Sequence, residues 1–251
     1  MTISEGADGK EAAGKIALIT GANKGLGLET ARQLGKAGAT VILGARVLAN
    51  GEQAASELRA MGVDASAIKL DVVNAADIAA AAETIGKTHG RLDILINNAG
   101  MMAETMTGNT SLTVSEAALR QTFDTNFFAV VNVTNAMLPL LRQSAAGRIV
   151  NLSIILGSLA LHAKGGLGVM TLAYDSSKAA LNAYTIHLAD ALKDTRIKVN
   201  SAHPGWVKTD MGTDAAPMEL VDGAKTQVRL ALLREDGPTG GFFHMGEALP
   251  W

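Results

Sequence analysis

The hydrophobic positions of this chain fall into short continuous runs that are separated by longer amphipathic stretches. The short runs are rich in Val, Ile and Leu, which is typical of strands buried on both faces of a sheet. They cover residues 15–20, 40–43, 65–69, 92–97, 148–153 and 198–203. The stretches between them are rich in Ala, Leu and Glu and have the length of helices. They cover residues 26–37, 51–61, 75–89, 115–141 and 176–193.

This alternation of strands and helices predicts a doubly wound parallel α/β sheet, the arrangement of the Rossmann fold. The 251 residues, 48% of them hydrophobic, are enough for one large core. We expect a single domain over residues 14–251, preceded by a flexible N-terminal tail over residues 1–13. Because such sheets bind ligands outside the carboxyl ends of their strands, functional residues are expected there.

Composition and charge narrow the classes of partner. A formal net charge of -2 and the lack of a long basic run argue against a nucleic-acid surface. Without cysteine there is no disulfide or thiolate metal site, and no cluster of other ligands suggests a metal. No apolar segment approaches the roughly 20 residues that span a bilayer. We therefore expect a cytoplasmic protein that uses neither a metal nor a membrane.

Three glycines, Gly21, Gly25 and Gly27, stand where the first strand hands over to the first helix. They allow a tight turn and bring the amide groups of the helix N-terminus against a pyrophosphate. Asn23 and Leu26 lie in the same turn and are counted with it. The spacing is wider than the common G-x-G-x-x-G, so an ordinary strand-helix loop is the alternative for this motif taken alone.

The cofactor preference follows from the end of the second strand. An acidic residue there would bind a ribose 2′-hydroxyl, but the chain has Arg46, and Lys24 in the turn adds a second cation. For either cation alone, the alternative is a solvated surface charge. The two together favour NADP(H) over NAD(H). Asp71, followed by Val72, is placed to accept a hydrogen bond from the adenine amino group. The alternative for Asp71 is a charge at a helix N-terminus.

Five motifs occur in an order and spacing that resemble the short-chain dehydrogenase/reductase family. They are residues 20–27, Asn97-Asn98-Ala99-Gly100, Asn126, Tyr174-x-x-x-Lys178 and Pro204-Gly205. The resemblance covers nearly the whole chain from Lys15 onward. Residues 202–211 and 240–244 look like the carbonyl-reductase-like branch of that family, which reduces aldehydes and ketones with NADPH.

The spacing of Tyr174 and Lys178 places both side chains on one face of a helix. An ammonium group beside the phenol would lower its pKa, which is about 10 when unperturbed. We therefore expect Tyr174 to be the proton donor. The resemblance implies that Lys178 also holds the nicotinamide ribose. It implies further that Asn126 stabilises a proton-relay water through a local helix distortion.

The same resemblance assigns further residues of the cofactor site. It places Asn97 and Ala99 along the ribose, and Val207 and Thr209 at the nicotinamide carboxamide.

One position departs from the family pattern. The resemblance implies a serine that hydrogen-bonds the substrate carbonyl, the second serine of the ending G-R-I-V-N-x-S-S. Ile154 stands there, and Ser153 comes one residue earlier. Because strand side chains alternate between faces, the Ser153 hydroxyl is expected to point away from the reacting carbon. The hypothesis is an activity that is weakened or retuned rather than abolished.

The region around the expected substrate is less specific. Residues 155–173 form the longest irregular stretch, and residues 161–170 are predicted to be a flexible insertion that shapes the substrate mouth or is a plain surface loop. Ile154, Trp206 and Met211 are candidates for the pocket, although packing alone explains Trp206 and Met211 equally well. His162 is expected to be solvated and is given no catalytic role.

The sequence thus predicts an NADP(H)-dependent oxidoreductase that reduces a small-molecule ketone or aldehyde, with Tyr174 as proton donor. The alternative is an NADP(H)-binding protein with little or no turnover, which Ile154 favours. The helices at 115–141 and 176–193 offer a face for a homo-oligomer, but the insertion before Tyr174 is able to cover it. Monomer and oligomer both stay open.

Overall fold

A computed structural model of the protein describes residues 11–104, 111–165, 167–168 and 170–251. Within these residues, eight strands form one sheet in the order β3-β2-β1-β4-β5-β6-β7-β8. The strands through β7 pair in parallel, and β8 runs antiparallel to β7. Their bounds are β1 (Ile16–Thr20), β2 (Thr40–Ala45), β3 (Ala65–Lys69), β4 (Ile94–Asn97), β5 (Arg148–Leu152), β6 (Lys198–Ala202), β7 (Phe242–His244) and β8 (Glu247–Ala248).

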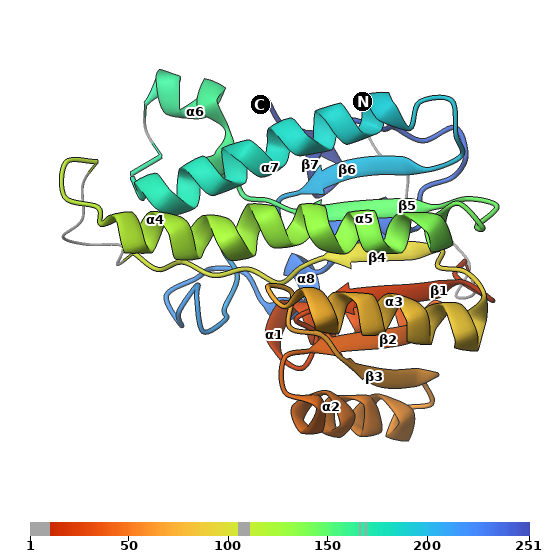
Figure 1. The fold of residues 1–251 in the computed structure, drawn as a ribbon. Helices are drawn as coiled ribbons and strands as arrows, with labels where there is room; N and C mark the ends of the chain where they lie inside the picture. Colours follow the sequence, from red (N-terminus) through yellow and green to blue (C-terminus); the bar gives the residue numbers. More distant parts are fainter. Residues whose placement is uncertain (1–10, 105–110, 166, 169) are drawn as a thin grey trace.

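Helices connect the strands and cover both faces of the sheet (Figure 1). They are α1 (Gly25–Lys36), α2 (Leu48–Ala60), α3 (Ala75–His89), α4 (Glu116–Phe123), the π-helical η1 (Asp124–Phe128), α5 (Ala129–Leu141), the 3₁₀ turn η2 (Ile155–Gly157), α6 (Leu159–Lys164), α7 (Leu172–Ala191), α8 (Leu220–Gly223) and α9 (Lys225–Ala231). The doubly wound parallel sheet expected from the sequence is confirmed.

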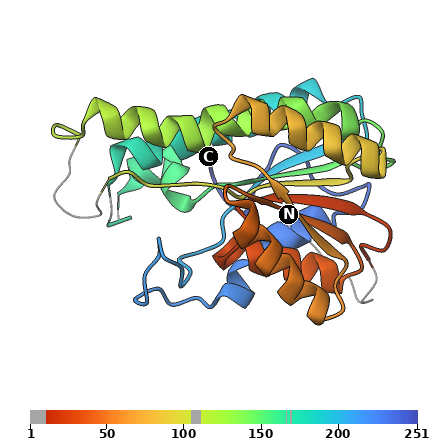
Figure 2. The ribbon, with the colours of Figure 1, turned by 60° about the horizontal axis from the view of Figure 1, so that its bottom comes forward.

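Each face of the sheet has its own hydrophobic core. Leu34 of α1 and Leu58 of α2 belong to one cluster, which also includes residues of α9. Ile85 of α3 and Met137 of α5 belong to the other, together with residues of α7. Figure 2 shows these two helical layers on opposite sides of the sheet. The strands are therefore buried on both faces, which explains their continuous apolar runs.

The structure corrects several boundaries. The helix expected at 115–141 is interrupted by η1, and the helix expected at 176–193 begins earlier, at Leu172. Residues 155–173 are not irregular throughout, because they contain η2, α6 and the start of α7. The Ser158 side chain accepts a hydrogen bond from Leu161 N at the start of α6. That N-cap was the local signal for the missed helix.

The expected tail boundary also changes. Ala12 is fully buried in the core, and its amide group donates to Ala37 O at 2.9 Å. Ala12 therefore packs against the domain, whereas Glu11 and Ala13 on either side of it are exposed. The remainder of the expected tail, residues 1–10, lies outside the described residues.

Candidate active site

A cleft of about 920 Å³ opens at the carboxyl ends of the parallel strands. Its walls come from the turn after β1, the ends of β2, β4 and β5, the start of α7 and the segment after β6. These pieces meet because parallel strands present their carboxyl ends at one edge of the sheet. Most of the residues expected to have a function line this one cleft.

The glycine-rich turn lies at one end of the cleft and is shaped by Asn98. The Asn98 side chain donates to Thr20 O at 2.8 Å and to Gly21 O at 3.2 Å. A Cβ atom at Gly27 would come within 2.5 Å of that amide nitrogen, so only glycine fits. The N-cap residue of α1, Lys24, makes no side-chain capping bond. The first amide groups of α1 thus remain available for an anion.

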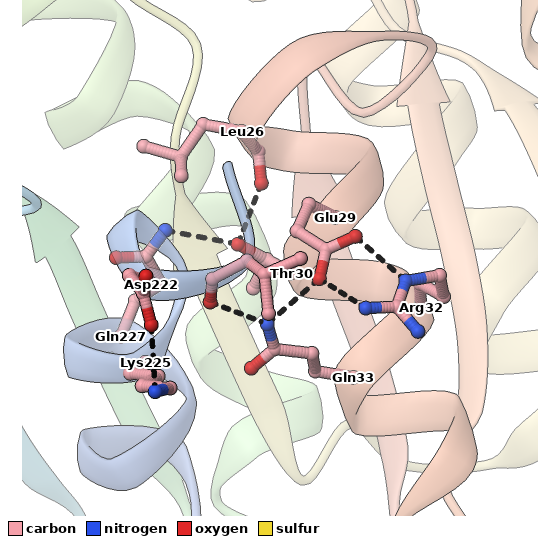
Figure 3. A network of polar contacts seen from close by, with 9 residues as sticks. Leu26, Glu29, Thr30, Arg32, Gln33, Asp222, Lys225 and Gln227 are labelled. Atoms are coloured by element: carbon pink, nitrogen blue, oxygen red, sulfur yellow. Dashed lines mark hydrogen bonds and ion pairs between the residues drawn. The ribbon is translucent and has the colours of Figure 1, made fainter. Parts of the chain in front are cut away.

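Helix α1 is fixed to the C-terminal part of the chain by a polar network (Figure 3). Gln227 of α9 donates to the Thr30 hydroxyl at 2.9 Å, and that hydroxyl donates to Leu26 O at 2.7 Å. Gln33 donates both to Glu29 and to the main chain of Val221, each at 2.8 Å. The network holds the helix that carries the anion-binding amides against the segment that follows β6.

The two expected cations of the cofactor site are both exposed. Arg46 follows β2 and lines the cleft. Lys24 also lines the cleft, but its ammonium group pairs with Asp210 at 2.5 Å, across the mouth between the glycine-rich turn and the segment after β6. The side chains of the pair are 72% and 80% exposed. Lys24 is therefore less free than the sequence suggested.

The acidic and amide residues expected at the cofactor divide into two groups. Asp71, Val72 and Ala99 line the cleft. Asp71 does not cap α3, because Asn74 accepts from the first amide groups of that helix. Asn97, in contrast, does not line this cleft: it is buried, and its amide group donates to Thr134 at 3.0 Å and Asn151 at 2.9 Å.

Asn98, which belongs to one of the five motifs but was given no role of its own, lines the cleft beside Ala99. The side chains of Asn97 and Asn98 use different partners, as expected for consecutive residues at a strand end. The alternation of strand faces was the signal that could have separated them.

Tyr174 and Lys178 stand on the first two turns of α7 and face the cleft. They are 7% and 4% exposed. The Lys178 ammonium group lies 5.7 Å from the centroid of the Tyr174 ring and donates to Leu152 O at 2.7 Å. Burial lowers the pKa of Lys178 to about 8. The face shared by the two side chains is as the sequence predicted.

The expected lowering of the Tyr174 pKa is wrong for this structure. Burial raises the pKa of Tyr174 well above its usual value, and the neighbouring Asp175 carboxyl raises it further. Desolvation and a nearby negative charge both disfavour the phenolate. The phenol is therefore held in its protonated form.

Asn126 lies in η1, which is the helix distortion implied by the resemblance. Its side chain accepts from Met101 N at 2.9 Å and donates to Met101 O at 2.8 Å. It also donates to the Ser177 hydroxyl at 3.0 Å. Asn126 is fully buried and joins the segment after β4 to α7.

Ser153 and Ile154 follow β5 and both line the cleft. The Ser153 hydroxyl is buried and has no hydrogen-bond partner among the described residues. Ile154 has an extended backbone with φ of -154° and directly precedes η2. Ser153, whose hydroxyl was expected to point away from the reacting carbon, lines the same cleft as Tyr174.

The segment after β6 forms the opposite wall. Val207, Thr209, Trp206 and Met211 all line the cleft. Trp206 is half exposed and its indole donates to Gly212 O at 2.7 Å, while the Thr209 hydroxyl accepts from Gly212 N at 3.0 Å. The segment is thus folded on itself beside the open side of the cleft.

The insertion before Tyr174 contacts the start of α7. His162 of α6 is not simply solvated: its Nε2 lies 2.7 Å from Leu156 O and 3.4 Å from the Asp175 carboxylate. Burial raises the pKa of Asp175.

Glu104, a residue without any local sequence signal, also reaches α7 and accepts from Tyr174 N at 3.0 Å.

Two kinds of feature are absent from the part of the chain that the structure describes. No group of three or more His, Cys, Asp or Glu side chains is arranged to hold a metal ion among those residues. None of the helices in the same described ranges has both the length and the apolar character needed to cross a membrane.

Comparisons with known proteins agree with this geometry. The family model described as short chain dehydrogenase matches residues 15–220. Short-chain dehydrogenase/reductase 1 of Saponaria officinalis is 33% identical, over 94% of this chain and 96% of that protein. Carbonyl reductase (NADPH) 3 of Rattus norvegicus is 34% identical, over 88% and 92%. The structure of an NADPH-bound carbonyl reductase from chicken fatty liver superposes with a TM-score of 0.82 at 27% identity, over 95% and 100%.

Proposed function

This chain belongs to the short-chain dehydrogenase family, and from that premise we propose that it is an NADP(H)-dependent oxidoreductase that reduces a ketone or aldehyde to an alcohol. The observation that carries the proposal is the meeting of two sets of residues in one cleft. Tyr174 and Lys178 line the same 920 Å³ space as the glycine-rich turn. A proton donor and an anion-binding turn in one site fit a reduction that uses a phosphate-bearing cofactor.

The residues present fit NADP(H). The turn closes so tightly that a Cβ atom at Gly27 would clash with Asn98 and with the main chain of Gly21, and the uncapped amide groups of α1 are the donors that a pyrophosphate needs. Arg46 and Lys24 supply positive charge for a 2′-phosphate. The names of the relatives, among them NADPH carbonyl reductases, support the same cofactor.

NADPH supplies the hydride when it is bound. Tyr174 donates the phenolic proton to the carbonyl oxygen, so that ketone, hydride and proton together give the alcohol. The raised pKa of Tyr174 keeps this proton in place until a stronger base, the forming alkoxide, accepts it. Lys178 is held at its position by Leu152 O and brings an ammonium group beside the phenol. Positive charge there stabilises the phenolate that remains.

Ile154 and the segment with Trp206 and Met211 form the apolar side of the cleft, and we propose them as substrate contacts. At the position where the family has a serine, Ile154 offers no hydrogen-bond donor to the carbonyl. Turnover is therefore expected to depend more heavily on Tyr174 than in a relative with that serine.

The test is NADPH consumption with a panel of aromatic and aliphatic ketones, compared between the protein and its Tyr174→Phe variant. General acid catalysis contributes about 10²-fold to 10⁴-fold, so Tyr174→Phe should lose turnover by that order while NADPH binding is kept. Tyr184→Phe, on the same helix outside the cleft, is the matched control and should keep its turnover. Equal turnover in the Tyr174→Phe variant and the parent would contradict the proposal.

A second candidate is an NADP(H)-binding protein with little turnover, and Ile154 is the observation that favours it. In that case the parent and Tyr174→Phe would both bind NADPH and neither would consume it with any ketone. The same experiment therefore separates the two functions.

A further inference from the structure

Glu104 is a buried carboxyl group at the start of the helix that carries Tyr174. It is 5% exposed, and its Oε2 accepts a hydrogen bond from Tyr174 N at 3.0 Å across 70 residues of sequence. Its Oε1 is buried and has no hydrogen-bond partner in the described ranges. Burying a carboxyl group is costly unless its hydrogen bonds compensate. The position of the Glu104 carboxyl group therefore needs an explanation other than stability.

The first turn of α7 lacks the cap that helices ordinarily have. Thr171 is the N-cap residue, but its side chain makes no capping bond, because its hydroxyl donates to Asp175 Oδ1 at 2.7 Å. Tyr174 is the third residue of the helix, the position whose amide group an N-cap side chain normally satisfies. Glu104 satisfies that amide from a distant segment instead.

The Tyr174 carbonyl is held as well. It accepts from the Ser177 hydroxyl at 2.7 Å, and that hydroxyl accepts from Asn126 at 3.0 Å. Asn126 is bonded in both directions to the main chain of Met101, three residues before Glu104. The bonds thus form a closed circuit from Glu104 through Tyr174, Ser177 and Asn126 back to the segment after β4.

We propose that Glu104 is a positioning residue for the proton donor: it fixes the main chain of Tyr174 in the first turn of α7, and so the place of the phenol in the cleft. The inference rests on the proposed function, in which the phenol protonates the substrate. Glu104 does not line the cleft and acts only through Tyr174. Because a misplacement of about 1 Å is enough to cost roughly 10²-fold in rate, a single main-chain bond at this point has a catalytic consequence.

The experiment compares Glu104→Gln with Glu104→Met in the full chain. Both side chains are close to glutamate in length, but only glutamine keeps an oxygen that accepts from Tyr174 N. Thr185→Val is the matched structural control, because it removes a buried hydroxyl of α7 that bonds Asn151 and Ser201, away from the cleft. The readouts are kcat, KM, NADPH affinity, and hydrogen exchange at the amide group of Tyr174.

We expect Glu104→Met to lower kcat about 10-fold to 100-fold with KM and NADPH affinity within about twofold, and to speed amide exchange at Tyr174. Glu104→Gln should keep kcat within about threefold, and Thr185→Val should keep it despite lower stability. A Glu104→Met variant with undiminished kcat, beside a Tyr174→Phe variant that is inactive, would overturn the inference. If the parent itself turns over no ketone, the proposed function fails, and equal amide exchange in both Glu104 variants would then overturn the placement of Tyr174 by Glu104.

Discussion

The two ends of the cleft hold their charged groups in opposite ways. At the cofactor end, Lys24 and Arg46 are exposed, and Lys24 pairs with Asp210 in contact with water. At the catalytic end, Tyr174 and Lys178 are almost completely buried. The Lys178 ammonium group donates to Leu152 O, and the Tyr174 amide group donates to the Glu104 side chain. Exposed charges interact weakly and are screened by salt. Burial shifts pKa values strongly, and a buried polar group that loses its partner cannot bond to water instead.

This difference predicts which substitutions reduce activity most. A change at the catalytic end removes an interaction for which water offers no replacement. A change at the cofactor end alters a charge that solvent and ions already weaken. The expected effects therefore decrease from α7 toward the glycine-rich turn.

The largest effect is expected from Lys178→Met. The substitution keeps the buried chain but removes the ammonium group 5.7 Å from the Tyr174 ring, and we expect kcat to fall by at least about 10²-fold. The control is Lys193→Met, which removes an exposed lysine just beyond the end of the same helix. Steady-state NADPH consumption measures both variants. A similar loss in both, or a Lys178→Met variant within tenfold of the parent, would contradict the contrast between buried and exposed lysines.

Ile154→Ser should raise activity. A serine there would add a hydrogen-bond donor for the developing oxyanion, and one such donor is worth on the order of 10²-fold to 10³-fold in established sites. We expect a gain in kcat of about 10-fold to 100-fold, because the present cleft is built around an apolar side chain. Ile155→Ser is the control, since the next side chain along does not line the cleft. No gain from Ile154→Ser over Ile155→Ser would remove the case for a retuned site.

The buried lysine also predicts how stability depends on pH. Burial lowers the pKa of Lys178 from 10.5 to about 8, so between these values the unfolded chain binds more protons than the folded one. The free energy of unfolding therefore rises with pH in this window, by at most about 1.4 kcal/mol per pH unit from this group. Denaturant unfolding of the parent and of Lys178→Met at pH 8 and pH 10 checks this. The difference should shift by about 1–2 kcal/mol in favour of the parent, and a constant difference would count against it.

The smallest expected effect is at the exposed pair. Asp210→Asn frees Lys24 from its partner, so NADPH should bind about twofold to threefold more tightly at low salt, with no change for NADH. The gain should vanish at high salt because exposed charges are screened. Asp214→Asn, an exposed acid of the same segment, is the control. Fluorescence titration of both cofactors gives the affinities, and an equal gain for NADH would show that the 2′-phosphate is not involved.

Local sequence patterns predicted most of the fold. The apolar runs located six of the strands within two residues, because a strand buried on both faces must be apolar throughout. They missed β7 and β8, which have three and two residues and are too short to show a period. The apolar runs also gave no sign of the break at η1, because a π-helical turn has no simple hydrophobic signature, and only the family resemblance implied a distortion at Asn126.

The sequence predicted most of the residues that line the cleft, but not their long-range bonds or their electrostatics. The turn with Gly21 and Gly27, and the shared face of Tyr174 and Lys178, follow from backbone geometry over a few residues. The electrostatics did not follow, since the pKa of Tyr174 depends on how deeply the folded chain buries it.

The sequence by itself therefore determined the order of the six longer strands, the family and most of the residues that meet at the strand ends. Only the tertiary structure decided which distant groups complete them: Asp210 reaches Lys24 across 186 residues, and Glu104 reaches Tyr174 across 70. Periodicity records which face of an element is apolar, and this is a local property of the chain. The partner of a single polar atom depends on which segments lie side by side in the folded chain. The arrangement of the strands in the sheet brings together segments that share no sequence pattern.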